Sequence, residues 1–192
     1  MMDRNRDSPW NPADSVVITP NAYERQVVDW LRHAGSGLKD FRVDHLVHRT
    51  GAGGEYEFDG VAEFTLFDGA KIIVLVECKR YKEPVKRDVV LIMHAKLHDV
   101  GAHKGMIFST SGFQRGALAY ASMHGIATVT FIEGKLLYET RSAGPSDDPP
   151  SWLNLPAFAG LFLAEEEGKI AVSTIDGEHL DVLSDWLAST PR

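Results

Sequence analysis

The sequence is poor in cysteine and has no long apolar run. Its 192 residues include one cysteine, which cannot form an internal disulfide, so a reducing cytoplasm is the expected compartment. No segment approaches the roughly 18 consecutive apolar residues of a membrane-spanning helix. The N-terminal residues also form no apolar signal-peptide core. We therefore expect a soluble, cytoplasmic protein without a membrane partner.

The chain also lacks an excess of positive charge. Its formal net charge of −7 argues against a general polybasic coat for nucleic acid. A local basic face is still compatible with this charge, because residues 80–87 contain Arg80, Lys82, Lys86 and Arg87. This cluster is either a solvated turn or the border of a site. Apolar residues make up 44% of the chain and charged residues 24%, which is typical of a globular protein with one principal domain.

Composition divides the chain into four predicted segments. They are an N-terminal arm (1–20), a principal domain (21–140), a linker rich in proline, glycine and serine (141–151) and a small C-terminal extension of unknown role (152–192). Within the extension we expect short strands around Gly168 and a final helix at residues 177–187.

The principal domain alternates between helical and strand-like patterns. Helices are predicted from residue 21 to the glycines at 35 and 37, at 86–100 with Gly101 as C-cap, and at 113–124; strands are predicted at 41–48, 57–67, 71–81, 105–109 and 126–132. This order predicts a mixed α/β sheet flanked by helices. In the second strand, alternation places Phe58 on the same face as Ala62 and Phe64, and Asp59 on the other face.

One short stretch combines opposite charges at the end of an apolar strand. Residues 72–76 are all apolar, and Glu77-Cys78-Lys79 follow directly. Because side chains alternate along a strand, Glu77 and Lys79 point the same way, roughly 7 Å apart, whereas Cys78 points to the opposite face. Two unlike charges where a buried strand reaches the surface need an explanation, and catalysis is the leading one.

Asp59, on the preceding antiparallel strand, completes a pattern typical of metal-dependent nucleases. Hydrolysis of a phosphodiester needs charge neutralisation and an activated water, which Mg²⁺ supplies when held by one or two carboxylates. Asp59 and Glu77 are that pair, and the backbone carbonyl of Cys78 adds a third oxygen. Lys79 would position the water or stabilise charge on the phosphate. Glu57 is the main competitor for the role of Asp59, and Glu55 and Glu63 are further acids that instead could pair with Lys79 or Arg80.

Four other residues have both a functional and a structural interpretation. Glu24 is either a helper of the cation site or a favourable acid near the start of the first helix. Lys96 falls within the apolar stripe of its helix, so it either reaches the site or extends its stem to solvent. His94 either contacts phosphate or is exposed. Ser109 opens a Ser-Thr-Ser-Gly turn that either binds phosphate or caps the next helix.

The remaining histidines show no spacing typical of a zinc site, and one cysteine is too few for a thiolate cage. We interpret them as ordinary surface or core residues: His45, His48, His98, His103 and His124.

An ordered set of motifs between about residues 21 and 132 resembles the Mrr-type restriction endonucleases, a branch of the PD-(D/E)xK nuclease superfamily. These motifs are Tyr23-Glu24, Glu57-Phe58-Asp59-Gly60, Val76-Glu77-Cys78-Lys79-Arg80-Tyr81-Lys82, His94-Ala95-Lys96-Leu97, Gly101-Ala102-His103-Lys104-Gly105 and Ser109-Thr110-Ser111-Gly112-Phe113. The Glu-x-Lys triplet alone is weak evidence, whereas the ordered set is specific. Many relatives carry glutamine where this chain keeps Glu77.

The resemblance implies a restriction-endonuclease-like αβββαβ core with its site on the central hairpin. It implies cleavage of DNA with Mg²⁺, for which Mn²⁺ would substitute, in defence against foreign or modified DNA. The implied catalytic residues are Asp59, Glu77, Lys79 and Glu24, and the implied DNA contacts are Lys96, His94, Arg80, Lys82 and Ser109. A Holliday-junction or repair nuclease on the same fold, and a non-catalytic binding module that kept the fold, are the alternatives.

The chain departs from the family pattern outside this core. Family members often carry a separate DNA-binding domain, and the sequence contains no recognisable winged helix or zinc finger. A separate targeting partner is therefore expected. Double-strand cutting generally asks for two sites, which predicts a homodimer.

Overall fold

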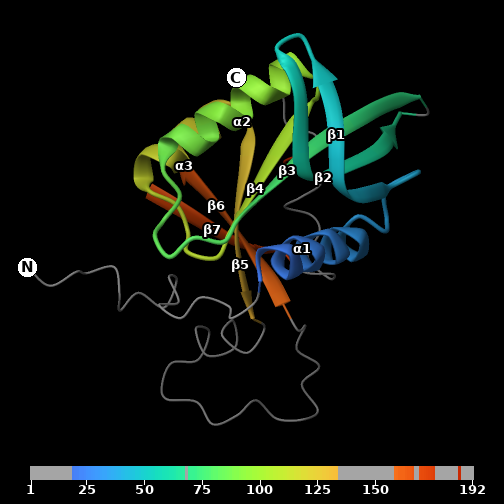
Figure 1. Cartoon of the computed structure of the whole chain (residues 1–192). Coiled ribbons are helices and arrows are strands. Elements are labelled where there is room, and N and C mark those ends of the chain that lie inside the picture. Colours follow the sequence, from blue (N-terminus) through green and yellow to red (C-terminus); the bar gives the residue numbers. More distant parts are fainter. Residues whose placement is uncertain (1–18, 68, 134–157, 167–168, 176–185, 187–192) are drawn as a thin grey trace, which may run out of the picture.

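The computed structural model describes residues 19–67, 69–133, 158–166, 169–175 and 186 (Figure 1). Its elements are, in chain order, α1 (Pro20–Ala34), β1 (Arg42–Gly51), β2 (Gly54–Leu66), β3 (Ala70–Lys79), α2 (Arg87–Asp99), β4 (Lys104–Ser109), α3 (Arg115–Met123), β5 (Ile126–Glu133), β6 (Phe158–Glu166) and β7 (Lys169–Ile175). Every element predicted between residues 21 and 132 is present, with ends that differ by no more than three residues.

The seven strands form one mixed sheet in which their order follows the sequence. β3, β4 and β5 are parallel, and all the other neighbouring pairs are antiparallel. Parallel neighbours need a crossover connection, and here α2 and α3 provide the two crossovers. The predicted mixed α/β fold with flanking helices is thus confirmed.

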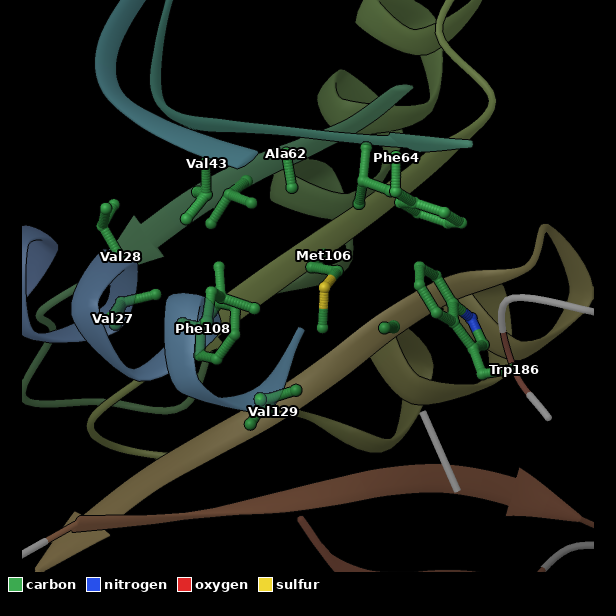
Figure 2. Close-up of a cluster of buried hydrophobic side chains, with 14 of the residues drawn as sticks. Val27, Val28, Val43, Ala62, Phe64, Met106, Phe108, Val129 and Trp186 are labelled. Carbon is green, nitrogen blue, oxygen red and sulfur yellow. The ribbon is translucent and has the colours of Figure 1, made fainter. Parts of the chain in front are cut away.

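Helices cover both faces of this sheet (Figure 1). α1 packs on one face, where Val27 of α1 and Phe108 of β4 belong to one buried cluster (Figure 2). Val74 and Val76 of β3 belong to the same cluster. α2 and α3 cover the other face, where Leu75 packs with residues of both helices. β3 is therefore buried on both sides, which explains its uninterrupted apolar run.

Local signals fix the ends of the helices that lie near the candidate site. The Thr19 hydroxyl accepts the Ala22 backbone N–H at 3.2 Å, so Thr19 is the N-cap of α1, and Pro20 takes the first helical position. Gly101 follows α2 with a φ of 65°, a left-handed conformation that glycine adopts without strain.

The predicted faces of β2 are wrong at one position. Phe58 packs with Val61 and Leu75 on the α2 side of the sheet, whereas Ala62 and Phe64 pack on the α1 side. Strict alternation would place Phe58 and Ala62 on the same face of the sheet. They lie on opposite faces, so the alternation of β2 is interrupted near Asp59. The hydrogen-bonded register between β2 and β3 also stops there, with Gly60 and Val76 as its terminal pair.

Strands from the predicted C-terminal extension continue the sheet. β6 pairs with β5 and β7 pairs with β6, on either side of residues 167–168, where short strands were expected. Trp186 is buried in the core cluster on the α1 side (Figure 2). Its carbonyl accepts a hydrogen bond from the Lys104 ammonium at 2.7 Å. The arm before residue 19, the linker at 141–151 and the final helix, apart from Trp186, lie outside the described residues.

No helix in the described part of the chain combines the length and the apolar character needed to cross a membrane.

Candidate active site

The candidate site lies where β2 and β3 separate. The Asp59 carboxylate accepts the Cys78 backbone N–H at 2.6 Å, in the place where a β2 carbonyl would continue the ladder. The carboxylate of Asp59 is therefore held against the backbone between Glu77 and Lys79. This geometry agrees with the predicted meeting of Asp59 and the Glu-x-Lys triplet at the end of the central hairpin.

Glu77 lies between two ammonium groups. Its Oε1 atom is 2.5 Å from the Lys79 Nζ atom, and its Oε2 atom is 3.4 Å from the Lys96 Nζ atom. Lys96 comes from α2, and its ammonium also lies 5.2 Å from the centre of the Phe58 ring. All three charged side chains are at most 20% exposed. Lys96 thus reaches the site rather than extending to solvent.

Four ionisable groups act on one another at this point. Burial, together with the charges of Glu77 and Glu24, raises the pKa of Asp59 to about 6, although the Cys78 N–H and Lys79 oppose the rise. Burial disfavours the charge of Lys79, but Glu77 outweighs burial and raises the pKa of that ammonium. Glu77 therefore favours the cationic form of Lys79 in the metal-free protein.

The Cys78 side chain faces away from this cluster, as strand alternation predicted. It packs against the core on the α1 side, and burial raises the pKa of its thiol well above the usual range. A buried, protonated thiol is neither a nucleophile nor a metal ligand. Only the backbone of Cys78 is available to the site.

Glu24 approaches from α1 and has a partner that the sequence did not indicate. Its Oε2 atom lies 3.1 Å from the Nε2 atom of His45 on β1, and both side chains are largely buried. Because α1 begins at Pro20, Glu24 lies beyond the first turn, which weakens the explanation based on the helix dipole. The sequence does contain a signal for His45. It lies two residues after Val43 on the same strand, so both side chains point toward α1.

The backbone of β1 is strained opposite the site. Leu46 has a φ of 52°, which is uncommon for a bulky residue, and the β1–β2 register places it opposite Asp59. Strain of this kind concentrates where strands are bent around functional sites. At Asp59 both neighbours of β2 therefore depart from regular pairing.

The competing acids have other partners. Glu57 is exposed and lies 3.2 Å from a His48 ring nitrogen, and Glu55 lies 3.7 Å from the other nitrogen of that ring. Glu63 is buried and pairs with Arg42, Arg49 and Lys71. The structure brings none of these acids to Lys79 or Arg80 in the described part of the chain, so its geometry favours Asp59.

Two of the expected DNA contacts lie elsewhere. His94 packs between α2 and α3, where its Nδ1 atom is 3.1 Å from the Tyr120 hydroxyl and its Nε2 atom is 3.0 Å from His98 Nε2. The His124 ring lies 4.1 Å from the His94 ring. The structure therefore places His94 in a histidine cluster, which sequence spacing did not reveal because His124 is distant along the chain.

Ser109 is fully buried, and its hydroxyl is used within a turn. It donates to the Gly112 carbonyl at 3.1 Å and accepts the Ser111 N–H at 3.1 Å. The α3 N-cap is Gln114, without a side-chain cap bond. Ser109 thus neither caps that helix nor presents its hydroxyl to a phosphate.

Arg80 and Lys82 border an open hollow directly after β3. The hollow measures about 530 Å³ and is lined by residues between Arg80 and Val89. No ion pair joins Arg80, Lys82 or Lys86 to another described residue. The basic cluster seen in the sequence is therefore the border of a concave surface beside the candidate site.

The donor set suits a hard divalent cation. The described residues include no ready-made cage of three or more His, Cys, Asp or Glu side chains. Mg²⁺ does not need such a cage, because it is bound by one or two carboxylates and keeps several waters. Burial and, after it, repulsion from Glu77 and Glu24 raise the pKa of Asp59, and a bound cation would offset both effects.

Comparison with known families identifies the kind of domain to which this candidate site belongs. The model of the Mrr_cat family, described as a restriction endonuclease, matches residues 16–140, well over half of the chain. This chain belongs to the Mrr-type restriction endonuclease family. The matched range of this Mrr-type chain contains every candidate site residue, from Glu24 to Ser109.

Two solved structures resemble the Mrr-type chain. A protein of unknown function, AF1548, is 26% identical with a TM-score of 0.47, and the match covers 57% of each chain. The DNA modification-dependent restriction endonuclease AspBHI is 21% identical with a TM-score of 0.39, and the match covers 54% of this chain and 25% of that one. The chain thus spans little more than half of the first protein and a quarter of the second. No match was found among curated proteins.

Proposed function

We propose that this chain is a metal-dependent endonuclease that hydrolyses phosphodiester bonds in DNA. The observation that carries the proposal is the meeting of Asp59, Glu77 and Lys79 where β2 and β3 separate, in a member of a restriction endonuclease family. Residues 21–140 would form the catalytic domain. The substrate would be foreign or modified DNA.

Each site residue would have a separate role in binding the cation or stabilising charge. Asp59, Glu77 and the Cys78 carbonyl would hold Mg²⁺ or Mn²⁺, and Glu24 would add negative charge behind them. The bound cation would neutralise phosphate charge and lower the pKa of a coordinated water. Lys79 pairs with Glu77 in the metal-free protein. With Glu77 engaged, Lys79 would orient the attacking water or stabilise the charge that develops on the phosphate.

DNA would approach across the end of β3 and the start of α2. Arg80 and Lys82 would contact backbone phosphates, and Lys96 would stay behind Glu77 as a second positive charge. Such contacts carry no sequence information. Recognition of a target would therefore depend on a separate specificity partner, and a symmetric homodimer would supply two sites for double-strand cuts.

Cleavage by a Lys79→Ala variant tests the catalytic role. Supercoiled plasmid is incubated with the full chain and Mg²⁺ or Mn²⁺, and nicked and linear products are quantified over time. We expect the variant to be slower by about 100-fold, the usual loss when a charge-stabilising group is removed. Lys169→Ala is the matched control, because Lys169 is an exposed lysine on β7. Equal rates for wild type and Lys79→Ala would overturn the proposal.

Metal binding tests the ligand assignment without relying on activity. Isothermal titration with Mn²⁺ should show one site in wild type that is lost in Asp59→Ala and kept in Glu57→Ala. The second variant is matched because it removes an acid two residues away that pairs with exposed His48. Loss of binding in Glu57→Ala alone would assign the acid to Glu57. A panel of linear, four-way-junction and methylated DNA would then identify the preferred substrate.

A further inference from the structure

The loop between β3 and α2, residues 80–86, forms a preformed hollow beside the candidate active site. It begins one residue after Lys79, so it borders the candidate site directly. It is open to solvent and has a volume of about 530 Å³. It is thus large enough for one nucleotide.

The neighbouring β4–α3 turn holds this loop in place (Figure 1). The Thr110 hydroxyl donates to the Tyr81 carbonyl at 3.2 Å, and the Ser111 hydroxyl donates to the Glu83 carbonyl at 2.6 Å. Val85 is fully buried and exchanges backbone hydrogen bonds with residues 112 and 114. The backbone of the loop is therefore held in place before any ligand arrives, which lowers the cost of binding.

The lining combines cations with an exposed aromatic ring. Arg80, Lys82 and Lys86 have no ion-pair partner among the described residues, whereas nearby Arg87 lies over the Tyr120 ring at 5.0 Å. Tyr81 is 45% exposed, so its ring is accessible beside these cations. Positive charge beside an exposed ring is the combination that binds single-stranded nucleic acid.

Two carboxylates argue against a groove for phosphates alone. Glu83 and Asp88 also line the hollow and would repel a phosphate backbone. Carboxylates do accept hydrogen bonds from the amino groups at base edges. Pro84 and Val89 add apolar surface of the kind that covers a base rather than a phosphate. The chemistry of the lining therefore matches a whole nucleotide.

We propose that this hollow binds one unstacked DNA nucleotide next to the cleaved phosphate. Tyr81 stacks on its base, Arg80, Lys82 and Lys86 neutralise the flanking phosphates, and the carboxylates of Glu83 and Asp88 contact the base edge. The proposal rests on the nuclease function proposed above, because it takes its ligand from the strand that occupies that site. It predicts a preference for DNA in which a base near the cut is already unpaired.

A double-mutant cycle between protein and ligand tests the base contact directly. Fluorescence anisotropy measures the affinity of the full chain, in EDTA, for a labelled thymidine hexanucleotide and for the same sugar–phosphate chain without bases. Wild type should bind the thymidine chain about tenfold more tightly, since stacking of a base on an aromatic ring has that order of effect. Tyr81→Ala should bind both chains equally, whereas Tyr81→Phe should keep the difference.

Two controls separate the base contact from general effects. Phe67→Ala removes another exposed ring, 95% exposed in the β2–β3 turn, and should leave the tenfold difference intact. Lys86→Ala should weaken the binding of both ligand chains by the same factor. It should also reduce the slope of log K against log salt by about 0.7, the contribution of one single-strand phosphate contact.

The outcomes distinguish this proposal from the nuclease proposal. Equal affinity of wild type for the two chains, absence of binding, or an unchanged difference in Tyr81→Ala would overturn the nucleotide site. A protein that nicks plasmid but does not discriminate the chains keeps its nuclease function and loses this site. A protein that discriminates the chains without nicking DNA keeps the site as a nucleotide-binding hollow.

Discussion

The carboxyl group of Asp59 is ionised at neutral pH only at a cost to folding. Burial and the charges of Glu77 and Glu24 place its folded-state pKa at about 6, above the ordinary 3.8. An acid with a raised pKa stabilises the fold at low pH, and this stabilisation is lost as pH rises through 3.8 to 6. Above pH 6 the protein therefore retains a destabilising charge, which agrees with the cation site proposed above.

Asp59→Asn should consequently stabilise the metal-free protein while abolishing cleavage. The amide stays neutral and still accepts the Cys78 N–H, so we expect a gain of about 1–2 kcal/mol in the free energy of unfolding at pH 7.5. Near pH 4 the gain should vanish, because the wild-type carboxyl is then protonated. Urea denaturation at both pH values measures the difference, and Glu57→Gln, at an exposed acid, should change little at either. A destabilised Asp59→Asn at pH 7.5 would contradict the pKa assignment.

At the scale of the elements, one buried acid joins the three strands of the hairpin region. Glu63 on β2 is only 3% exposed and pairs with Arg42 and Arg49 from β1 and, at 2.8 Å, with Lys71 from β3. Burial disfavours its charge, but the three cations outweigh burial and lower the pKa of Glu63 to about 2. This network fixes β2 against both neighbours a few residues from Asp59.

Glu63→Gln should therefore destabilise the protein in a pH-dependent way. A folded-state pKa of about 2 against an ordinary 4.5 contributes stability that is complete above pH 4.5 and is lost as pH falls toward 2. We expect the variant to lose about 2–3 kcal/mol at pH 7 and progressively less below pH 4.5. Guanidinium titrations from pH 7 to 3 follow this convergence, with Glu57→Gln as the exposed control. A loss that is constant with pH would show that the charge of Glu63 is not the cause.

Sequence patterns predict the elements well and their faces less well. The apolar run of β3 and the Gly101 stop signal of α2 have local causes, so both elements could be read from the chain. The position of Phe58 depends on where the β2–β3 ladder ends, which is a property of two strands together. Ser109 is likewise buried because its β4–α3 turn packs against the distant loop between β3 and α2. Glu77 and Lys79 were predictable as neighbours because alternation along β3 places them on one face, and Asp59 because β2 and β3 are consecutive antiparallel strands.

At the scale of the whole molecule, the least predictable feature is the continuation of the sheet beyond β5. β6 pairs with β5 across a long intervening segment, and α3 also packs on β6. No local pattern specifies pairing or register over such a separation. The sequence therefore predicted strands in the C-terminal region but not that they extend the same sheet. The sequence around Trp186 likewise contains no pattern that predicts its burial in the core on the α1 side.

Trp186→Ala should show that this C-terminal contact belongs to the same folding unit as the candidate site. Trp186 is 8% exposed and packs in one cluster with Met106 and Val129 (Figure 2). The buried Lys104 ammonium donates a hydrogen bond to its carbonyl. Removing a buried indole costs about 3–5 kcal/mol. Urea denaturation should record that loss within a single transition, and Met123→Ala, at a 63% exposed methionine on α3, should change stability by less than about 0.5 kcal/mol. A loss below 1 kcal/mol for Trp186→Ala, or a second transition in wild type, would mean that the core around the site is stable without this contact.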